Sequence, residues 1–264
     1  MASTDPVILL GTVLLEPNRW TPRKQPSFAV STLVPAIRAA GFDGLELWEN
    51  HAALADPAEQ EALKHLPLPV TVFNSYCTFD DAGAAGRQRA AQLVRAYRAS
   101  GVKFNFGRDP ALIGTYLRHL EIWAAELPAG CRLLCECHAD TVLEEPDAAA
   151  RILAPFAKRV EIIVHPFGGG RAMLQRWLDR FGPAVTHLHV ADRNSERRHI
   201  LLSEDADEVR ARLAVLRAAG FSGTWTIEFT KGVAQPPEDL HELLRRAAAD
   251  MAFIREHLPG ATAC

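Results

Sequence analysis

The chain has 264 residues, of which 48% are hydrophobic, and a formal net charge of −3. This length and composition suit one large core, so we expect a single domain over residues 1–264. The near balance of charge disfavours a nucleic-acid partner, because such binding depends on neutralising phosphates. No apolar run approaches the ~20 residues of a membrane span, and residues 1–6 lack the features of a signal peptide. We therefore expect a cytoplasmic protein with no membrane partner.

Eight segments have the composition of β-strands. We predict strands over residues 7–15, 45–48, 70–76, 102–106, 132–138, 160–165, 185–190 and 224–230. Between them, apolar residues recur at helical spacing, as in Ile113, Leu117 and Leu120. Strands that alternate with helices indicate an α/β protein with a parallel sheet. Because the first turn has no glycine cluster, we predict a (β/α)8 TIM barrel rather than a doubly wound sheet.

The fifth predicted strand ends in Cys135, Glu136, Cys137 and His138, four residue types that bind metals. Successive side chains of a strand point to opposite faces, so Glu136 and His138 share one face and the two cysteines share the other. We expect the cysteines to face the helices as small core residues. The chain has five cysteines, an odd number, and we expect reduced thiols.

Three later predicted strands also end in a group that binds metals, namely His165, His189 and Glu228. In a TIM barrel the carboxyl ends of all strands converge on one face, so these groups are expected to surround one pocket with Glu136. A single strand histidine is more often structural, but four convergent donors favour a site. Mixed oxygen and nitrogen donors suit Mn²⁺, Zn²⁺, Co²⁺ or Fe²⁺ better than Ca²⁺. We predict one divalent metal site.

Several segments resemble the xylose-isomerase-like barrels, a superfamily that includes sugar and sugar-phosphate isomerases and epimerases. They are residues 41–47, 134–138, 164–167, 187–192 and 225–228. The resemblance implies a metal-dependent isomerase or epimerase of carbohydrate metabolism, with Glu136, His165, His189 and Glu228 holding Mn, Zn, Co, Fe or Mg. Members commonly have an aspartate on strand six and a histidine three residues later, whereas this chain has His165 and Gly168. The identity of the metal and the reaction therefore stay open.

The resemblance also implies catalytic roles. In the ketohexose epimerases the glutamates of strands five and eight exchange a proton with the substrate, which assigns that role to Glu136 and Glu228. His138 is a second candidate base, because imidazole titrates near neutral pH. A divalent ion would stabilise the enolate that forms. β-Elimination from a keto-sugar or keto-cyclitol, by a lyase or dehydratase, is an alternative on the same site.

Two other function classes are alternatives to a sugar isomerase. Endonucleases of the superfamily use extra histidines on early strands, but the predicted strands two to four end in Trp48, Tyr76 and Phe106. A repurposed barrel or subunit with an altered metal site is the remaining class. For an enzyme, the expected partner is a small carbohydrate-like substrate, and a homo-oligomer is left open.

Seven residues near strand ends or in the first loop are candidates for substrate contact. They are Trp20, Glu46, Trp48, Asn74, Arg108, His187 and Arg193. Glu46 has an equal structural interpretation, a buried ion pair that supports the barrel, and His187 is expected to lie deeper than the donors. The basic loop at residues 19–24 is interpreted either as a lid over a polar or anionic ligand or as exposed surface.

Overall fold

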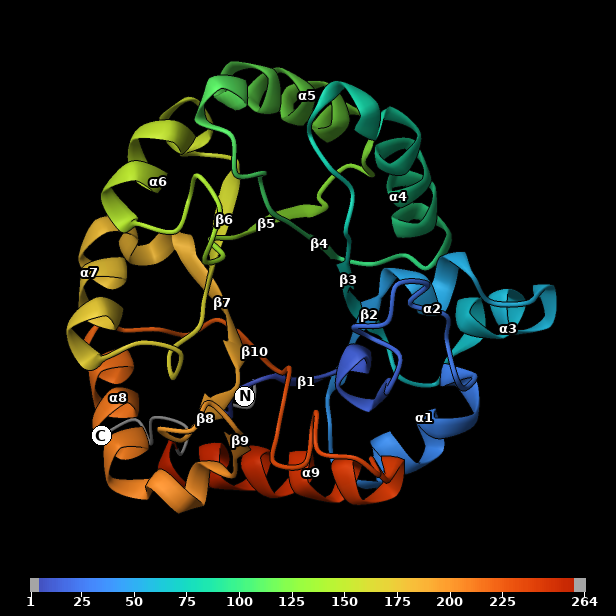
Figure 1. Ribbon diagram of the computed structural model, residues 1–264, viewed down its shortest axis with the longest axis vertical. Helices are drawn as coiled ribbons and strands as arrows, with labels where there is room; N and C mark the ends of the chain where they lie inside the picture. The colour runs from blue at the N-terminus through green and yellow to red at the C-terminus, as the bar shows by residue number, and fades with distance from the viewer. Residues whose placement is uncertain (1–4, 259–264) are drawn as a thin grey trace.

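Eight short apolar segments pair as parallel strands and close into a barrel in the computed structural model, which describes residues 5–258 (Figure 1). The first strand pairs with both the second and the last, and this closes the sheet. In the order around the barrel, the strands are β1 (Ile8–Gly11), β10 (Thr224–Ile227), β7 (Val185–Val190), β6 (Val160–Val164), β5 (Arg132–Glu136), β4 (Gly101–Phe104), β3 (Val70–Asn74) and β2 (Gly44–Trp48). The predicted α/β TIM barrel is confirmed.

Amphipathic helices surround the strands and bury their apolar faces against them (Figure 1). They are α1 (Val30–Ala39), α2 (Glu49–Ala53), α3 (Pro57–Ala62), α4 (Ala84–Ala96), α5 (Ile113–Glu126), α6 (Pro146–Leu153), α7 (Arg171–Phe181), α8 (Ala206–Ala218) and α9 (Leu240–His257). None of the described helices is both long enough and apolar enough to cross a membrane.

Most of the predicted strands extend beyond the observed ones. The first was predicted over residues 7–15, but β1 ends at Gly11 and Thr12–Leu15 is a 3-10 helix. The third, fourth, fifth, sixth and eighth predictions run one to three residues too far, because the neighbouring strands no longer pair there. His138, His165 and Glu228 therefore follow their strands, in the loops at the carboxyl end of the barrel.

The two faces of each strand meet different surroundings. In β1, Ile8 and Leu10 belong to the main core between strands and helices, so Leu9 points into the barrel. Leu9 forms a separate small apolar cluster with Val72, Leu134 and Ile163. Leu134 and Ile163 each lie two residues before a predicted metal donor, one step deeper in the barrel. These four side chains, which we call the apolar floor, share the barrel interior with the buried polar residues Glu46, Lys103 and His187.

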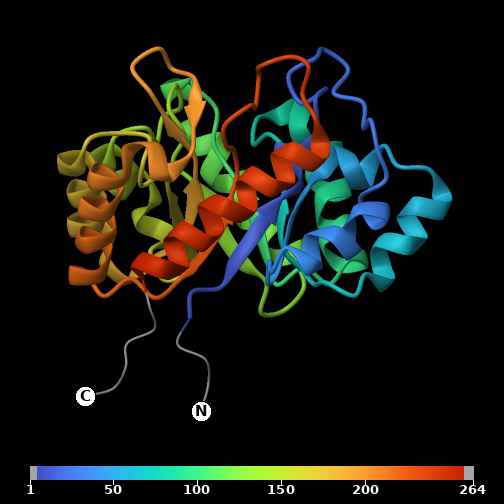
Figure 2. The same ribbon diagram turned by 90° about the horizontal axis from the view of Figure 1, so that it is seen from below.

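A two-stranded antiparallel hairpin follows β7 and was not predicted. Its strands are β8 (Asp192–Arg193) and β9 (His199–Ile200), with Arg193 opposite His199. Figure 2 shows the hairpin rising from the barrel on the side away from the start of β1. It therefore stands at the carboxyl ends of the barrel strands.

Candidate metal centre

The four predicted donors come together at the carboxyl ends of four adjacent strands. Glu136 ends β5, His165 follows β6, His189 lies in β7 and Glu228 follows β10. Each offers one donor atom, and these atoms all lie within 4.8 Å of one another. Glu136, His189 and Glu228 are buried, whereas His165 is half-buried. The convergence that a barrel imposes on strand ends thus produces a buried cluster of two carboxylates and two imidazoles.

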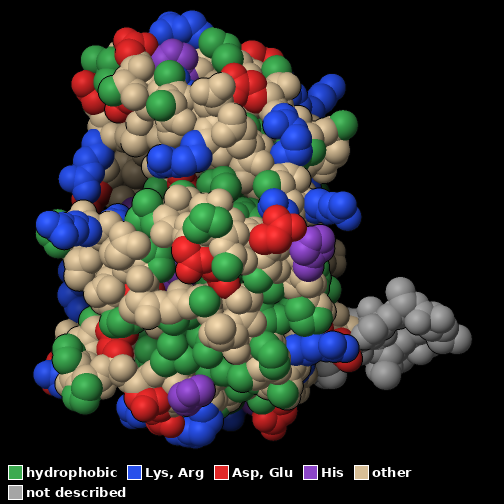
Figure 3. Space-filling view, turned by 90° about the vertical axis from the view of Figure 1, so that its right-hand side faces the viewer, with side chains coloured by type: hydrophobic (Ala, Val, Ile, Leu, Met, Phe, Trp, Pro, Cys, Tyr) green, Lys and Arg blue, Asp and Glu red, His purple; other side chains and the backbone are tan. Residues whose placement is uncertain are grey.

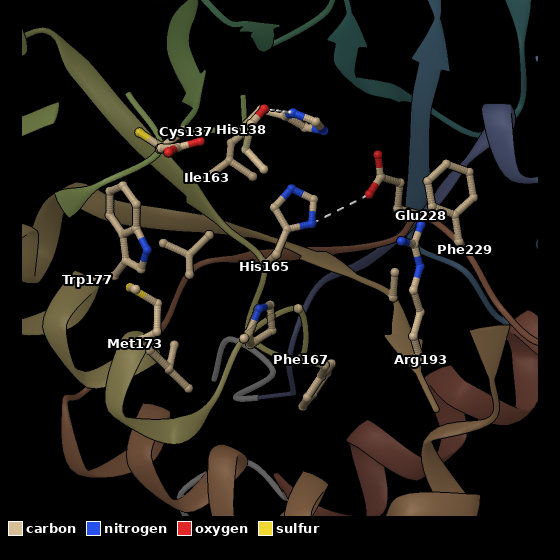
Figure 4. A pocket seen from close by; sticks show the side chains of 18 of the residues that line it. Cys137, His138, Ile163, His165, Phe167, Met173, Trp177, Arg193, Glu228 and Phe229 are labelled. Carbon is tan, nitrogen blue, oxygen red and sulfur yellow. Dashed lines mark hydrogen bonds and ion pairs between the residues drawn. The ribbon is translucent and has the colours of Figure 1, made fainter. Parts of the chain in front are cut away.

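The distances within this cluster fit a divalent ion. Glu136 Oε1 lies 3.0 Å from His165 Nε2 and 3.3 Å from His189 Nδ1. Glu228 Oε1 lies 3.6 Å from His189 Nδ1, and its Oε2 lies 3.8 Å from His165 Nδ1 (Figure 4). Ligands about 2.1 Å from one ion stand about 3 to 4 Å apart. His165 faces Glu136 with Nε2 and Glu228 with Nδ1, so a metal bound through one of these nitrogens would replace only one of the two contacts. The buried His/Glu cluster is a candidate site for a divalent metal ion.

Glu46 organises the cluster from below. This carboxylate is buried inside the barrel and accepts hydrogen bonds from Asn74 Nδ2 (2.7 Å) and Thr226 Oγ1 (2.8 Å). Its Oε2 also lies 3.1 Å from His189 Nε2 and 3.2 Å from His187 Nε2. If His189 donates from Nε2 to Glu46, its Nδ1 lone pair faces Glu136, which is the arrangement that metal-binding histidines usually have.

Burial and opposite charges shift the pKa values of these groups. Burial raises the pKa of Glu46, but His189 and His187 more than offset this and hold that pKa well below its usual range. Burial lowers the pKa of His189, but Glu46 and Glu228 hold it well above its ordinary value. Without a metal, a buried carboxylate and a buried imidazolium therefore stabilise each other. Binding of a metal at Nδ1 would displace the proton there.

Lys103 on β4 is a partner that the sequence analysis missed. Its Nζ lies 2.7 Å from Glu136 Oε2, and both side chains are 3% exposed. Burial raises the pKa of Glu136, but Lys103 and His165 lower it by more than burial raises it. The pKa of Glu136 therefore lies well below its usual range. The signal was present in the sequence, because Lys103 stands between Val102 and Phe104 in an apolar strand. With Oε2 held by Lys103, Glu136 presents Oε1 to the two histidines.

A cavity of about 670 Å³ opens above the cluster, large enough for a small carbohydrate. Its lining includes His165 and Glu228 of the donor cluster and Ile163 of the apolar floor. Figure 4 shows Trp177 and Met173 on one side of His165, with Arg193 and Phe229 on the other. The cavity lies at the carboxyl ends of the strands, where TIM barrels hold their active sites.

The predicted catalytic histidine lines this cavity. His138 is exposed, its Nδ1 lies 2.6 Å from the Ala139 carbonyl oxygen, and its ring centroid lies 6.4 Å from that of His165.

The two cysteines beside Glu136 have different surroundings. Cys135 is buried in the main core as predicted, but Cys137 also lines the cavity, because β5 has already ended at Glu136.

The described cysteines Cys77, Cys131, Cys135 and Cys137 are free thiols, in agreement with the prediction. Cys264 lies outside the described residues.

The candidates for substrate contact divide into three groups. Arg193 lines the cavity, and the exposed Trp20 lies with its ring centroid 5.6 Å from that of Phe229, which also lines it. Glu46, Trp48, Asn74 and His187 are buried and do not belong to the lining. The Arg108 side chain is 81% exposed and lies outside the lining.

The first loop is more firmly held than a flexible lid requires. Arg19 is buried, donates to the carbonyl oxygens of Val13 and Leu14, and pairs with Glu238 at 2.6 Å. Its charge is therefore used within the fold. This excludes Arg19 from the set of basic residues that could contact an anionic ligand.

Comparisons with known proteins show which solved structures share this fold. No protein-family profile matches the sequence, and no curated protein matches it. Solved structures do match, and one is a xylose isomerase-like TIM barrel protein from Mycobacterium smegmatis in complex with magnesium. It is 16% identical with a TM-score of 0.64, over 98% of this chain and 100% of that one. This chain has the xylose-isomerase-like TIM-barrel fold.

Other solved structures match nearly as well. A 3-keto-D-glucoside 4-epimerase from E. coli is 18% identical with a TM-score of 0.62, over 95% of this chain and 99% of that one. Endonuclease IV from Thermus thermophilus is 14% identical with a TM-score of 0.59, over 86% and 94%. At these identities the comparisons establish the fold, and the reaction has to be argued from the site.

Proposed function

We propose that the protein is a divalent-metal-dependent isomerase or epimerase that acts on a sugar, a sugar phosphate or a related keto-polyol. The observation that carries this proposal is the cluster of Glu136, His165, His189 and Glu228 beneath a cavity of about 670 Å³. A divalent ion held by these residues would supply positive charge that stabilises negative charge developing on a substrate oxygen. The similarity in fold to a keto-glucoside epimerase supports the same reaction class.

The two glutamates differ in access to the cavity, and we assign them different roles. Glu228 lines the cavity and is 8% exposed, whereas Glu136 is 2% exposed, pairs with Lys103 and is not part of the lining. We therefore assign proton abstraction from a substrate carbon to Glu228, in addition to its place in the metal cluster, and metal binding alone to Glu136. This departs from the symmetric roles that the sequence resemblance implies.

Epimerisation needs a second proton carrier, because the proton leaves one face of the carbon and returns to the other. His138 is the candidate, since it is exposed and lines the cavity, and imidazole is the side chain that most often acts as a general acid or base. Lys103 keeps Glu136 ionised, and Glu46 orients His189. Glu228 and His138 thus account for proton transfer, and Lys103 and Glu46 account for the ionisation and orientation of the metal donors.

The test is exchange of substrate hydrogen with solvent. The protein is incubated in D₂O with a panel of keto-sugars and their phosphates, and deuterium in the recovered sugar is measured by mass spectrometry. We expect exchange with at least one compound, loss of exchange on chelation, recovery with Mn²⁺, and loss in Glu228→Gln. The matched control is Glu144→Gln, because Glu144 lines the cavity but its carboxylate accepts the Asp140 N–H at 2.7 Å.

Two results would contradict the proposal. One is purified protein that contains no stoichiometric divalent ion and is unaffected by chelation. The other is exchange by Glu228→Gln at the wild-type rate. The same experiment identifies a lyase, because β-elimination lowers the mass of the recovered sugar by one water.

Hydrolysis of nucleic acid is less well supported. Figure 3 shows basic and acidic side chains interspersed over the side of the molecule that carries α2 and α3, without a continuous basic surface there. The residues at the ends of β2, β3 and β4 are Trp48, Asn74 and Phe104, none of which is a histidine. Within residues 5–258, the groups able to hold a metal are the two His/Glu clusters around His189.

A further inference from the structure

The hairpin β8–β9 brings two arginines to the cavity. Arg193 lies in β8 and Arg197 in the turn between the strands, and both line the cavity with Asn194. The turn is well defined, since Asn194 Oδ1 accepts the N–H groups of Glu196 and Arg198 at 3.0 Å each. The two guanidinium groups are thus carried by an ordered structure that belongs to the cavity wall.

Neither guanidinium group is neutralised within the described part of the chain. No carboxylate of residues 5–258 pairs with Arg193 or Arg197, and the side-chain contact of Arg193 is the His199 ring, with Nη2 3.3 Å from Nε2. The neighbouring Arg198 differs, because its Nε lies 3.3 Å from Glu196 Oε2 and it is not part of the lining. Two arginines without a carboxylate partner among the described residues therefore line the cavity.

The acidic residues of the same cavity already have partners. Glu145 pairs with Arg176 at 3.1 Å, and Glu144 accepts a backbone N–H. Glu228 belongs to the metal cluster, where a bound ion would offset its charge. Phe229, next to Glu228, packs against the His199 ring at 5.2 Å between centroids and thereby supports the contact of His199 with Arg193. The cavity thus offers positive charge that the protein itself does not use.

We propose that the β8–β9 hairpin is an anion subsite, in which Arg193 and Arg197 bind a phosphate or carboxylate group carried by the substrate. Guanidinium groups form paired, charge-assisted hydrogen bonds with both kinds of oxyanion. This inference rests on the proposed function for the reaction and adds the substrate class, an acidic carbohydrate derivative. The acidic group binds at the hairpin side of the cavity, near Phe229 and across His165 from Trp177 (Figure 4).

The experiment measures binding without turnover. Isothermal titration calorimetry is performed with glycerol 3-phosphate, D-glycerate and glycerol, both on the protein as purified and after treatment with a chelator. We expect saturable binding of at least one anion in both preparations and none of glycerol. Arg193→Gln and Arg197→Gln should each raise the Kd about tenfold, and the lysine variants should raise it less. Binding only of the phosphate identifies a phosphate ester as the substrate, and binding only of glycerate identifies an acid.

The matched control is Arg198→Gln, which removes the same charge from the same turn at a position outside the cavity. It should leave the Kd within about twofold of wild type, as a specific rather than diffuse electrostatic effect requires. The subsite is refuted if neither anion binds saturably, if glycerol binds equally well, or if Arg198→Gln weakens binding as much as Arg193→Gln. Because binding is measured after chelation and without catalysis, failure of the isomerase proposal leaves this result interpretable.

Discussion

Lys103 Nζ lies 2.7 Å from Glu136 Oε2 in the interior of the barrel, and the two side chains are almost completely shielded from water. This ammonium group is the only lysine or arginine cation that forms an ion pair with the donor cluster among residues 5–258. It compensates part of the negative charge of Glu136 and Glu228 before any metal binds. The cluster is therefore held together by ion pairs within the protein as well as being a candidate metal site.

Removal of Lys103 should destabilise the protein strongly. Lys103→Met leaves Glu136 as a buried charge without its closest cation, and such losses cost about 3–5 kcal/mol. Urea denaturation in the presence of a chelator measures the free energy of unfolding without compensation by metal. Lys231→Met, which breaks the exposed pair with Glu204, is the control and should cost less than about 1 kcal/mol. A loss below 1 kcal/mol for Lys103→Met would show that the buried pair is not needed.

Glu46→Gln should weaken metal binding although it changes none of the four proposed metal ligands. The carboxylate orients His189 through Nε2, and loss of such a supporting group typically costs about 10- to 100-fold in metal affinity. Competition with a chromophoric chelator gives the Kd for Zn²⁺ or Mn²⁺. Glu16→Gln is a matched control, because Glu16 is an equally buried carboxylate that pairs with His51 at 3.1 Å outside the cluster. Equal loss of affinity in both variants would assign the effect to general destabilisation.

His165→Asp tests the residue at which this chain departs from the strand-six aspartate common in xylose-isomerase-like barrels. If His165 is a ligand, aspartate adds a negative charge at that position, and we expect about tenfold tighter binding of Mn²⁺ relative to Zn²⁺. His165→Ala should lose affinity for both ions. Unchanged affinities in both variants would make His165 a residue that lines the cavity without binding the metal.

Asp250 on α9 should make stability depend on pH. Burial raises its pKa from the ordinary value of 3.8 to about 7, although Thr230 and the Leu202 N–H donate to it. The unfolded carboxyl loses its proton near pH 4 while the folded one keeps it until about pH 7, so stability falls between these values as the pH rises.

Asp250→Asn removes this titration. Its free energy of unfolding relative to wild type should therefore increase by more than about 1 kcal/mol from pH 4.5 to pH 7.5, measured by urea denaturation. A difference that does not change with pH would contradict the raised pKa of Asp250.

The fold and the donor cluster were predictable because two simple regularities act together. Side-chain alternation assigned Glu136 to the barrel interior, and convergence of strand ends brought it together with His165 and Glu228. The limits of the strands were less predictable, since apolar residues such as those of Thr12–Leu15 suit a strand as well as a buried 3-10 helix.

Other features depend on tertiary contacts that the sequence does not display. The four hydrogen-bond partners of Glu46 come from β3, β7 and β10, far along the chain. The strands β8 and β9 have two residues each, too few to show a periodic pattern. Lys103 is the exception, because the alternation rule that selected Glu136 applies equally to a lysine between Val102 and Phe104.

The apolar floor determines how molecules pass through the barrel. Leu9, Val72, Leu134 and Ile163 are at most 1% exposed, and together with the buried Glu46, Lys103 and His187 they occupy the barrel interior on the side of the donor cluster away from the cavity. Metal, substrate and product therefore share one entrance, at the carboxyl ends of the strands. Traffic through a single entrance is sequential, so a product that stays bound delays the next substrate, and its departure becomes a step that can limit the rate of turnover.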